Sequence, residues 1–439
     1  MLCKASLLFS LLFAPAFAAP VDSNDSTIEG PVAQNRGGFV HVPIQKVKLD
    51  EEKFKKHITS LENIDPSDAK LVSAITDFDE KLDNERYYYT AQVEIGTPPQ
   101  QISLLVDTGS SDTWVFTSST QRKRGGSGST SIFDSGRSSS FKDNGTEFSI
   151  QYGKGSCSGS WGTDTLNIGG AVVKHLSIGL ASEVSQINTG LLGIGRPMAE
   201  STYVHGGDMY LNLPLKMQAE GLINSASYSL ALNDLNSGSG TILFGGVDRD
   251  YFHGPLMELP ITHPSHMGVT LNGMYASGVA NYNLMKKPMV TILDSGTSLS
   301  YLDGDTLSAY RTAVNSNPSF NLGSKYYTDC NVSNSLMLDF GKGHIEVPSY
   351  NFLWPVEMFV NKITAAIVFP RNSCYIGLEK NSAHEDFLLF GDNILRSMYI
   401  VYDVTDERIG VAKAKSPSGQ SDIEPIMAGK PFPFSSEFL

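Results

Sequence analysis

Positive charge is scarce in this sequence. Lys and Arg total 33 against 46 Asp and Glu, the formal net charge is −13, and charged residues make up only 18% of the chain. A protein that binds nucleic acid needs clustered Lys and Arg to neutralise phosphates. The composition therefore argues against a nucleic-acid partner.

Long hydrophobic runs are also lacking after the N-terminus. There, Lys4 precedes an apolar run at residues 5–13, and the small-x-small triplet Ala-Phe-Ala follows at residues 16–18. The run is too short to span a bilayer and has the layout of a secretory signal peptide. We therefore expect residues 1–18 to be a signal peptide and the protein to be secreted without stable membrane insertion, with the vacuole as another possible destination.

Cysteine is rare as well. Cys3 falls in the predicted signal peptide, which leaves Cys157, Cys330 and Cys374. In an oxidising compartment an odd number permits one disulfide and one free thiol. No His-x-x-x-His or Cys-x-x-Cys pair occurs, so we expect neither a metal site nor a cofactor. Sequons that are candidates for glycosylation begin at Asn24, Asn144 and Asn331.

From residue 87 onward the sequence has the pattern of short strands joined by turns. Glycine is abundant, with 41 residues, and alternating or apolar runs of strand length are bounded by Gly, Asn, Asp and Ser. This pattern is typical of an all-β protein, with a helix expected around residues 305–314. Residues 19–86 differ, because they are rich in charge and poor in glycine.

A repeat gives the strongest signal. LLVDTGSS at residues 104–111 recurs as TILDSGTS at residues 291–298, and each copy is followed, later in its half, by two apolar residues and Gly, at 191–193 and 389–391. Two copies of one β unit imply a bilobal molecule with pseudo-twofold symmetry. Asp107 and Asp294 would then meet on the axis between the lobes.

Two carboxylates held close together suit acid–base catalysis. Both cannot ionise cheaply, so one keeps its proton; the aspartic protease dyad is the standard illustration of this coupling. The ionised member can deprotonate a water, while the protonated member donates to a peptide carbonyl. Gly109 and Gly296 lack Cβ, so the two turns around Asp107 and Asp294 can approach closely.

Hydroxyl residues flank both aspartates. Thr108 and Ser295 could each tie one loop to the other lobe. Ser110 and Thr297 could donate hydrogen bonds to the outer carboxylate oxygens and lower the pKa of the carboxyl group that accepts the bond.

Residues 87–413 resemble the pepsin-like aspartic protease family. Both Asp loops have the form seen in the family, Trp114 follows the first loop, and Tyr152 in IQYGKGS resembles the flap tyrosine that hydrogen-bonds this tryptophan. GLLGIGRP and the segment at residues 227–248 look most like the fungal candidapepsin and yapsin branch.

The resemblance implies a monomeric endopeptidase that binds polypeptides and is inhibited by pepstatin. Its substrate cleft would lie between two lobes, at residues 87–249 and 250–415, and a tail would follow at 416–439. Asp107 and Asp294 would be catalytic. Residues implied to contact substrate or support the dyad are Tyr152, Trp114, Gly109, Gly296, Ser110 and Thr297.

The resemblance also implies a propeptide at residues 19–86 and a Cys330–Cys374 disulfide. Arg86 is a candidate processing point. A lysine from the group Lys46, Lys48, Lys53, Lys55 and Lys56 could pair with the dyad, or these lysines could form a solvated face.

Some features depart from the family or leave alternatives open. The usual first-lobe disulfide is absent, because its loop, QRKRGGSGSTS at residues 121–131, has no cysteine; this loop is either a solvated connection or a basic processing site. Cys157 fits a small buried hydrophobe. Asp112 could favour basic substrate side chains, or the cleft could take bulky apolar ones. A non-catalytic binding or inhibitory relative remains the alternative function.

Overall fold

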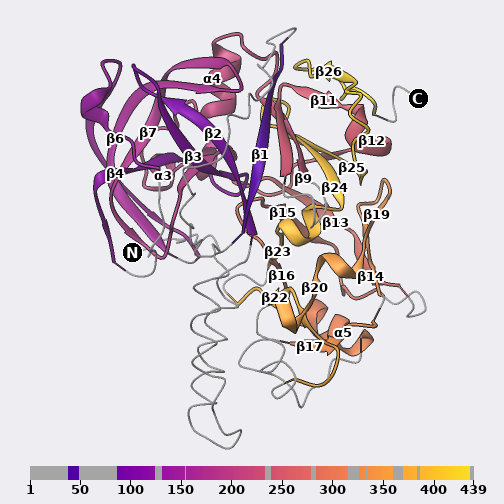
Figure 1. Cartoon of the computed structure of the whole chain (residues 1–439). Coiled ribbons are helices and arrows are strands. Elements are labelled where there is room, and N and C mark those ends of the chain that lie inside the picture. The colour runs from indigo at the N-terminus through magenta and orange to yellow at the C-terminus, as the bar shows by residue number, and fades with distance from the viewer. Residues whose placement is uncertain are drawn as a thin grey trace, which may run out of the picture.

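The computed structural model describes residues 38–48, 87–123, 131–153, 155–232, 239–277, 283–314, 326–332, 334–358, 369–382 and 386–435. Strands dominate these residues, and short helices lie at the edges (Figure 1). The predicted all-β fold is therefore confirmed. The predicted signal peptide, Asn24, most of the segment at 19–86 and residues 124–130 of the basic loop lie outside the described residues.

The strands of the first half are β1 (Val40–Lys48), β2 (Tyr87–Ile95), β3 (Gln100–Asp107), β4 (Thr113–Arg122), β5 (Lys142–Gln151), β6 (Ser156–Ile168), β7 (Ala171–Ser185), β8 (Gly190–Gly193), β9 (Ser227–Leu232), β10 (Ser239–Phe244) and β11 (Gly246–Asp248).

Those of the second half are β12 (Phe252–Pro260), β13 (Gly268–Leu271), β14 (Gly273–Ala276), β15 (Met289–Leu293), β16 (Ser300–Leu302), β17 (Tyr327–Asp329), β18 (Leu336–Asp339), β19 (His344–Val347), β20 (Leu353–Pro355), β21 (Ser373–Ile376), β22 (Leu378–Lys380), β23 (Phe387–Phe390), β24 (Met398–Asp403), β25 (Arg408–Ala414) and β26 (Ile423–Pro425).

The α-helices are α3 (Ser201–Val204), α4 (Leu213–Ala219), α5 (Gly304–Ala313) and α7 (Asp392–Leu395). Helix α5 matches the helix expected around residues 305–314. Asp303 fixes its start, since its side chain accepts hydrogen bonds from the backbone N–H groups of Asp305 and Thr306. Single turns of 3-10 helix lie at Ser135–Arg137, Pro197–Ala199, Arg249–Tyr251, Ser349–Asn351 and Val356–Met358.

The sequence repeat corresponds to a repeated strand arrangement. In the first half β3 pairs in parallel with β8, and β8 pairs antiparallel with β4. In the second half β15 pairs in parallel with β23, and β23 pairs antiparallel with β16. Each Asp-x-Gly turn thus connects the two outer strands of an equivalent three-strand unit, as the pseudo-twofold prediction requires.

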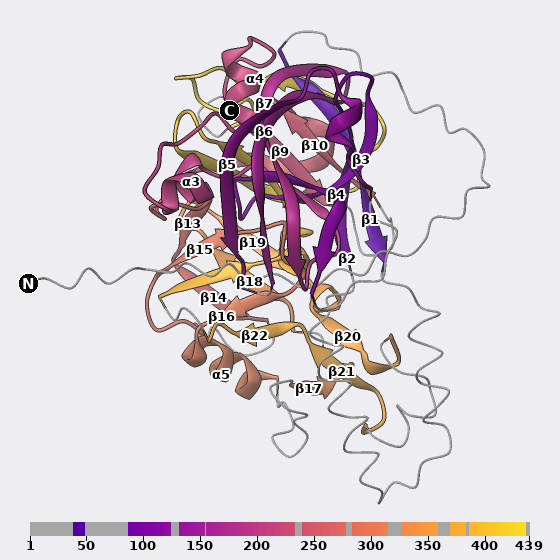
Figure 2. The ribbon, with the colours of Figure 1, turned by 90° about the vertical axis from the view of Figure 1, so that its left-hand side faces the viewer.

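One sheet joins the two halves. Its strand order is β12-β25-β24-β9-β10-β1-β2-β3-β8-β4-β7-β6-β5, so strands from the end of the chain pair with strands of the first half. The junction is the antiparallel pair of β24 with β9, where Tyr402 stacks on Tyr228 with ring centroids 4.9 Å apart. Figure 2 shows β4 to β7 layered above the smaller sheets of the second half.

Strand β1 lies within the segment predicted as a propeptide, and it occupies the middle of this sheet (Figure 1). It pairs with β10 on one side and with β2 on the other. Val40, Val42 and Ile44 are at most 2% exposed. This part of the segment is therefore a core strand.

The tail after residue 415 packs on the sheet that joins the two halves. Strand β26 pairs with β11, and Ser435 forms a bridge with Leu256. Phe432 is fully buried, and the guanidinium of Arg408 lies over its ring. The distance from Cζ of Arg408 to the ring centroid is 4.1 Å. The described part of the tail is thus integral to the fold.

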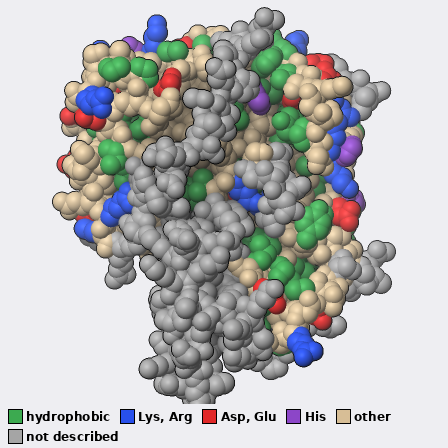
Figure 3. Space-filling model, viewed as in Figure 1, with side chains coloured by type: hydrophobic (Ala, Val, Ile, Leu, Met, Phe, Trp, Pro, Cys, Tyr) green, Lys and Arg blue, Asp and Glu red, His purple; other side chains and the backbone are tan. Residues whose placement is uncertain are grey.

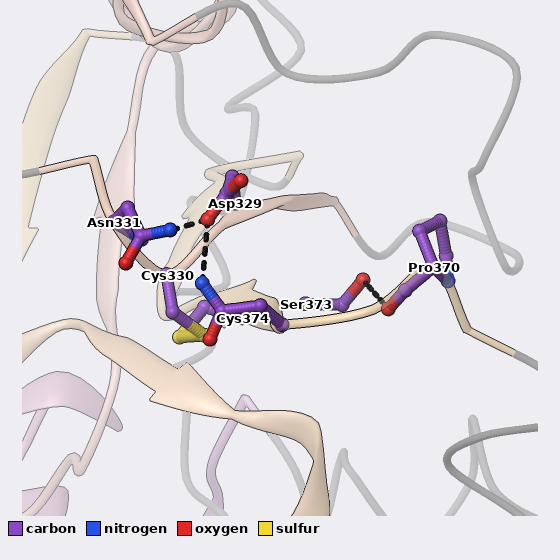
Figure 4. Close-up of a disulfide and its surroundings, with 7 residues drawn as sticks. Asp329, Cys330, Asn331, Pro370, Ser373 and Cys374 are labelled. Carbon is purple, nitrogen blue, oxygen red and sulfur yellow. Dashed lines mark hydrogen bonds between the residues drawn. A yellow bond between two sulfur atoms is a disulfide. The ribbon is translucent and has the colours of Figure 1, made fainter.

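The expected cysteine arrangement is present. Cys330 and Cys374 form a disulfide, and Asp329 beside it accepts hydrogen bonds from the backbone of Asn331 and the side chain of Asn372 (Figure 4). Cys157 is free and buried on β6. The candidate glycosylation residues Asn144 and Asn331 are both exposed.

Charged side chains are dispersed on the visible face. Among the described residues in Figure 3, Lys and Arg lie singly and are interspersed with Asp and Glu. Among the helices described, none is long and apolar enough to cross a membrane.

Candidate active site

The two aspartates occupy equivalent positions at the ends of buried strands. Asp107 ends β3, and its carbonyl accepts a hydrogen bond from the N–H of Ile194, 2.9 Å away. Asp294 follows β15, and its N–H donates to the carbonyl of Phe390, also at 2.9 Å. Both aspartates are almost completely buried.

The turn that follows Asp107 supplies hydrogen-bond donors to its carboxylate. The N–H of Gly109 donates to Oδ1 at 2.8 Å, and the hydroxyl of Ser110 donates to Oδ2. The Ser110 hydroxyl is thus bonded to the carboxylate oxygen that the N–H of Gly109 does not contact.

Asp294 receives the same pair of donors. The N–H of Gly296 donates to Oδ1 at 2.8 Å, and the hydroxyl of Thr297 donates to Oδ2 at 2.7 Å. Such donors stabilise the charged form of a carboxylate and so act against the effect of burial.

The two loops are hydrogen-bonded to one another. The hydroxyl of Thr108 donates to the carbonyl of Leu293 and accepts from the N–H of Ser295, both at 2.9 Å. The hydroxyl of Ser295 in turn donates to the carbonyl of Val106 at 2.9 Å. These reciprocal bonds fix the position of one aspartate relative to the other.

The carboxylates lie directly opposite each other, and the glycines make this approach possible. A Cβ atom added to Gly109 would lie 2.5 Å from Cγ of Asp294, and one added to Gly296 would collide with the carboxylate of Asp107. Any other residue at either position would push the opposite carboxylate away.

Burial and mutual repulsion set the electrostatics of the pair. Burial raises the pKa of Asp107 well above its ordinary value, and the facing charge of Asp294 raises it further. Burial also raises the pKa of Asp294, but the donors from Thr297 and Gly296 hold that rise back. The pair therefore titrates as a unit, with one proton shared between the two carboxyl groups.

Tyr152 lies at the tip of the hairpin formed by β5 and β6. Its backbone N–H donates to the carbonyl of Gly155, which closes the turn. Its hydroxyl accepts a hydrogen bond from Nε1 of Trp114 at 2.8 Å, and both rings are buried. The structure thus brings together the two aromatic residues that the sequence singled out.

Asp112 does not present its carboxylate to solvent. Oδ2 accepts from the N–H of Ser201 and Oδ1 accepts from the hydroxyl of Tyr210, and the residue is 2% exposed. Asp112 is therefore not available to a basic substrate side chain in this structure. Sequence reasoning missed its neighbours, because Ser201 and Tyr210 lie in a region without any recognisable motif.

The described residues offer no cluster of three or more His, Cys, Asp or Glu side chains that could hold a metal. Independently of this, two facing buried carboxyl groups can share one proton, which suits acid–base chemistry.

Comparisons with known proteins identify the family of this chain. The family model described as eukaryotic aspartyl protease matches residues 88–414. Aspartic proteinase 3 of Saccharomyces cerevisiae is 30% identical, covering 90% of this chain and 80% of that protein. The acid protease of Saccharomycopsis fibuligera is 32% identical, covering 94% of this chain and 100% of the relative.

Secreted aspartic protease 6 of Candida albicans is 35% identical over 76% of this chain and 78% of its own length. The crystal structure of an aspartic proteinase from Irpex lacteus matches with a TM-score of 0.62 at 23% identity, covering 76% of this chain and 96% of that one, and supports the fold. The predicted resemblance to fungal enzymes is confirmed by these relatives. The chain belongs to the eukaryotic aspartyl protease family, the pepsin-like aspartic endopeptidases.

Proposed function

We propose that this protein is a secreted endopeptidase that hydrolyses peptide bonds at acid pH with Asp107 and Asp294 as its catalytic residues. The observation that carries the proposal is the pair of buried carboxylates facing each other across two glycine turns. The family assignment implies polypeptide substrates, and relatives with secreted in their names favour the same destination for this chain.

The first step uses the single proton of the pair, which we assign to Asp107, leaving Asp294 ionised. Asp294, ionised, takes a proton from a water molecule as its oxygen attacks the carbonyl carbon of the substrate. Asp107, protonated, donates its proton to the carbonyl oxygen. The product of this step is a neutral tetrahedral diol, and the two aspartates have exchanged roles.

The second step breaks the C–N bond. The proton now on Asp294 passes to the amide nitrogen, which leaves as an amine. One diol hydroxyl returns its proton to Asp107 as the new carboxyl group forms. Both aspartates are then back in their starting states.

The protonation of Asp107 gives the pH dependence its sign. Burial raises the pKa of Asp107 well above the usual range, so the acid form persists as pH rises from acid values. Activity should fall on the alkaline side when this proton is lost, because no group then protonates the carbonyl oxygen. On the acid side it should fall when Asp294 becomes protonated and can no longer accept a proton from water.

The first prediction tests the dyad. Asp107→Asn and Asp294→Asn should each abolish cleavage of a denatured protein at about pH 4, since an amide neither holds the shared proton nor activates water. The wild-type activity should be blocked by pepstatin. Near-wild-type circular dichroism spectra would show that the variants fold, and appreciable activity in either purified, folded variant would refute the assignment.

We further propose that residues 1–18 are a signal peptide and residues 19–86 a propeptide. A non-catalytic binding protein is the alternative function. No observation favours it, since both aspartates keep their hydrogen-bond donors and Tyr152 keeps its bond to Trp114.

A further inference from the structure

Two acidic side chains are buried together beside the catalytic loop. Asp112 lies between β3 and β4, five positions after Asp107 in the chain. Glu200 immediately precedes α3 and is 0% exposed. Neither carboxylate takes part in the dyad.

Tyr210 connects the two carboxylates. Its hydroxyl donates to Oδ1 of Asp112 at 2.7 Å, and its backbone N–H donates to Oε2 of Glu200 at 2.7 Å. The N–H of Ser201 donates to the other oxygen of Asp112 at 2.9 Å. Oε1 of Glu200 is buried and accepts no hydrogen bond within the described residues.

No basic side chain donates a hydrogen bond to either carboxylate among the contacts that the described residues make. The titratable groups nearest to Asp112 are Glu200, His205, Tyr210, Tyr152 and Cys157. Of these only His205 can carry a positive charge, and its side chain is exposed to solvent. Without a buried cation nearby, burying two ionised carboxylates costs much more free energy than burying two neutral carboxyl groups.

The cluster also touches the stem of the Tyr152 hairpin. The ring of Tyr210 packs on Trp161 of β6 with centroids 5.6 Å apart. Trp161 packs on Phe148 of β5 at 5.0 Å. Helix α3, which Asp112 holds through Ser201, also lies against β5. The acidic cluster therefore lies between the catalytic loop and both strands of the hairpin.

We propose that Asp112, Glu200 and Tyr210 form an acidic brace that positions the Tyr152 hairpin on the Asp107 loop. The brace holds only while its two carboxyl groups are protonated, and it thereby sets the highest pH at which the first lobe stays folded. Asp112 and Glu200 are positioning residues in this proposal. It deepens the proposed acid-pH function, and its structural readout does not depend on that function.

The direction of the pH effect follows from linkage. Burial raises the pKa of Glu200 to about 8 and that of Asp112 to about 6, against ordinary carboxyl values near 4. The folded state thus holds these protons more tightly than the unfolded chain does. The stabilisation is fully present below about pH 4 and is lost as the pH rises through about 6 and then about 8.

The experiment compares the full-length wild type with Glu200→Gln, Asp112→Asn and Tyr210→Phe. Each protein is held at pH values from 4 to 9 and then assayed at pH 4, and its melting temperature is recorded at pH 4 and pH 8. Glu424→Gln is the matched control, because Glu424 is an exposed glutamate on β26.

An amide mimics the neutral carboxyl group and cannot ionise. Glu200→Gln should therefore raise the pH of half-inactivation by about one unit and raise the melting temperature at pH 8 but not at pH 4. Asp112→Asn should act in the same direction with a smaller shift. Tyr210→Phe removes the donor that stabilises ionised Asp112, so it should lower the pH of half-inactivation. The control should match the wild type.

Two outcomes would contradict the proposal. If Glu200→Gln lowers the melting temperature at both pH values, or leaves the inactivation profile unchanged, the carboxyl groups are ordinary packing elements and the proposal is wrong. If the wild type cleaves nothing, the proposed function fails, and the melting temperatures still decide whether the brace exists.

Discussion

At the scale of single residues, Tyr152 allows its ring and its hydroxyl to be tested separately. The ring is buried and the hydroxyl accepts from Trp114. Tyr152→Ala should lower kcat/KM by about tenfold or more, because a flap residue orients substrate and excludes water. Tyr152→Phe keeps the ring and should cost about 1 kcal/mol of stability for the lost hydrogen bond, with a smaller kinetic effect.

Steady-state kinetics and thermal unfolding on the same preparations provide the check. If Tyr152→Ala melts at a lower temperature but keeps wild-type kinetics, the residue is only a cross-strand aromatic.

The residues most readily predicted from the sequence are those within the repeated motif. Asp107, Ser110 and their counterparts Asp294 and Thr297 are recognisable because the same pattern occurs twice. Glu200 could not be predicted, since its importance comes from burial. Its link to Asp112 runs through Tyr210, and nothing local to either acidic residue signals it.

At the scale of elements, the Cys330–Cys374 disulfide ties the segment after α5 to β21. Closing a loop with a sequence separation of 44 residues should stabilise the folded protein. Chain entropy puts the gain at about 4 kcal/mol.

The double variant Cys330→Ser, Cys374→Ser should therefore melt well below the wild type. Wild type treated with reductant should melt at the same lowered temperature, because Cys157 remains free in both proteins. A double variant that loses less than about 1 kcal/mol would mean that the unfolded chain is already constrained in this region.

The sequence allows some strands and helices to be predicted, but not the position of β1 in the sheet. The paired three-strand units follow from the sequence repeat, and α5 lies where the sequence indicated a helix, around residues 305–314. The place of β1 could not be predicted, because VHVPIQKVK reads as one short strand without any signal for its partners. Its partners, β10 and β2, lie far apart from each other in the sequence, so no local pattern indicates that β1 pairs with both.

At the scale of the whole molecule, Arg196 connects the two halves. From the first half, its Nη1 donates to the carbonyls of His263 and Pro264 at 2.7 and 2.9 Å, and its Nη2 pairs with Glu407. Glu407 is 62% exposed, so the ion pair itself contributes little. The two carbonyl bonds are made by a residue that is only 6% exposed, and they should carry most of the effect.

Arg196→Ala should destabilise the protein by about 2–4 kcal/mol, since it leaves these carbonyls without their charged donor. Arg137→Ala is the control, because Arg137 is an exposed arginine of the first half. Glu407→Gln should cost less than about 1 kcal/mol. Equal melting temperatures for Arg196→Ala and Arg137→Ala would show that this contact does not hold the lobes together.

The proposed propeptide predicts a specific N-terminus. Secreted protein from the native host should begin near residue 87, after cleavage at or close to Arg86. N-terminal sequencing of the active fraction gives the answer. A fully active enzyme that begins at residue 19 would contradict the proposal.

Such a cut would change the status of β1. The strand of nine residues would no longer be held in the sheet by its own chain, but it would still be paired along both edges. It would become a bound peptide with a dissociation constant, whereas in the intact chain its tether supplies an effective concentration in the millimolar range. The cut enzyme would then obey mass action: concentrated samples would keep the peptide in the sheet, and dilution would release it.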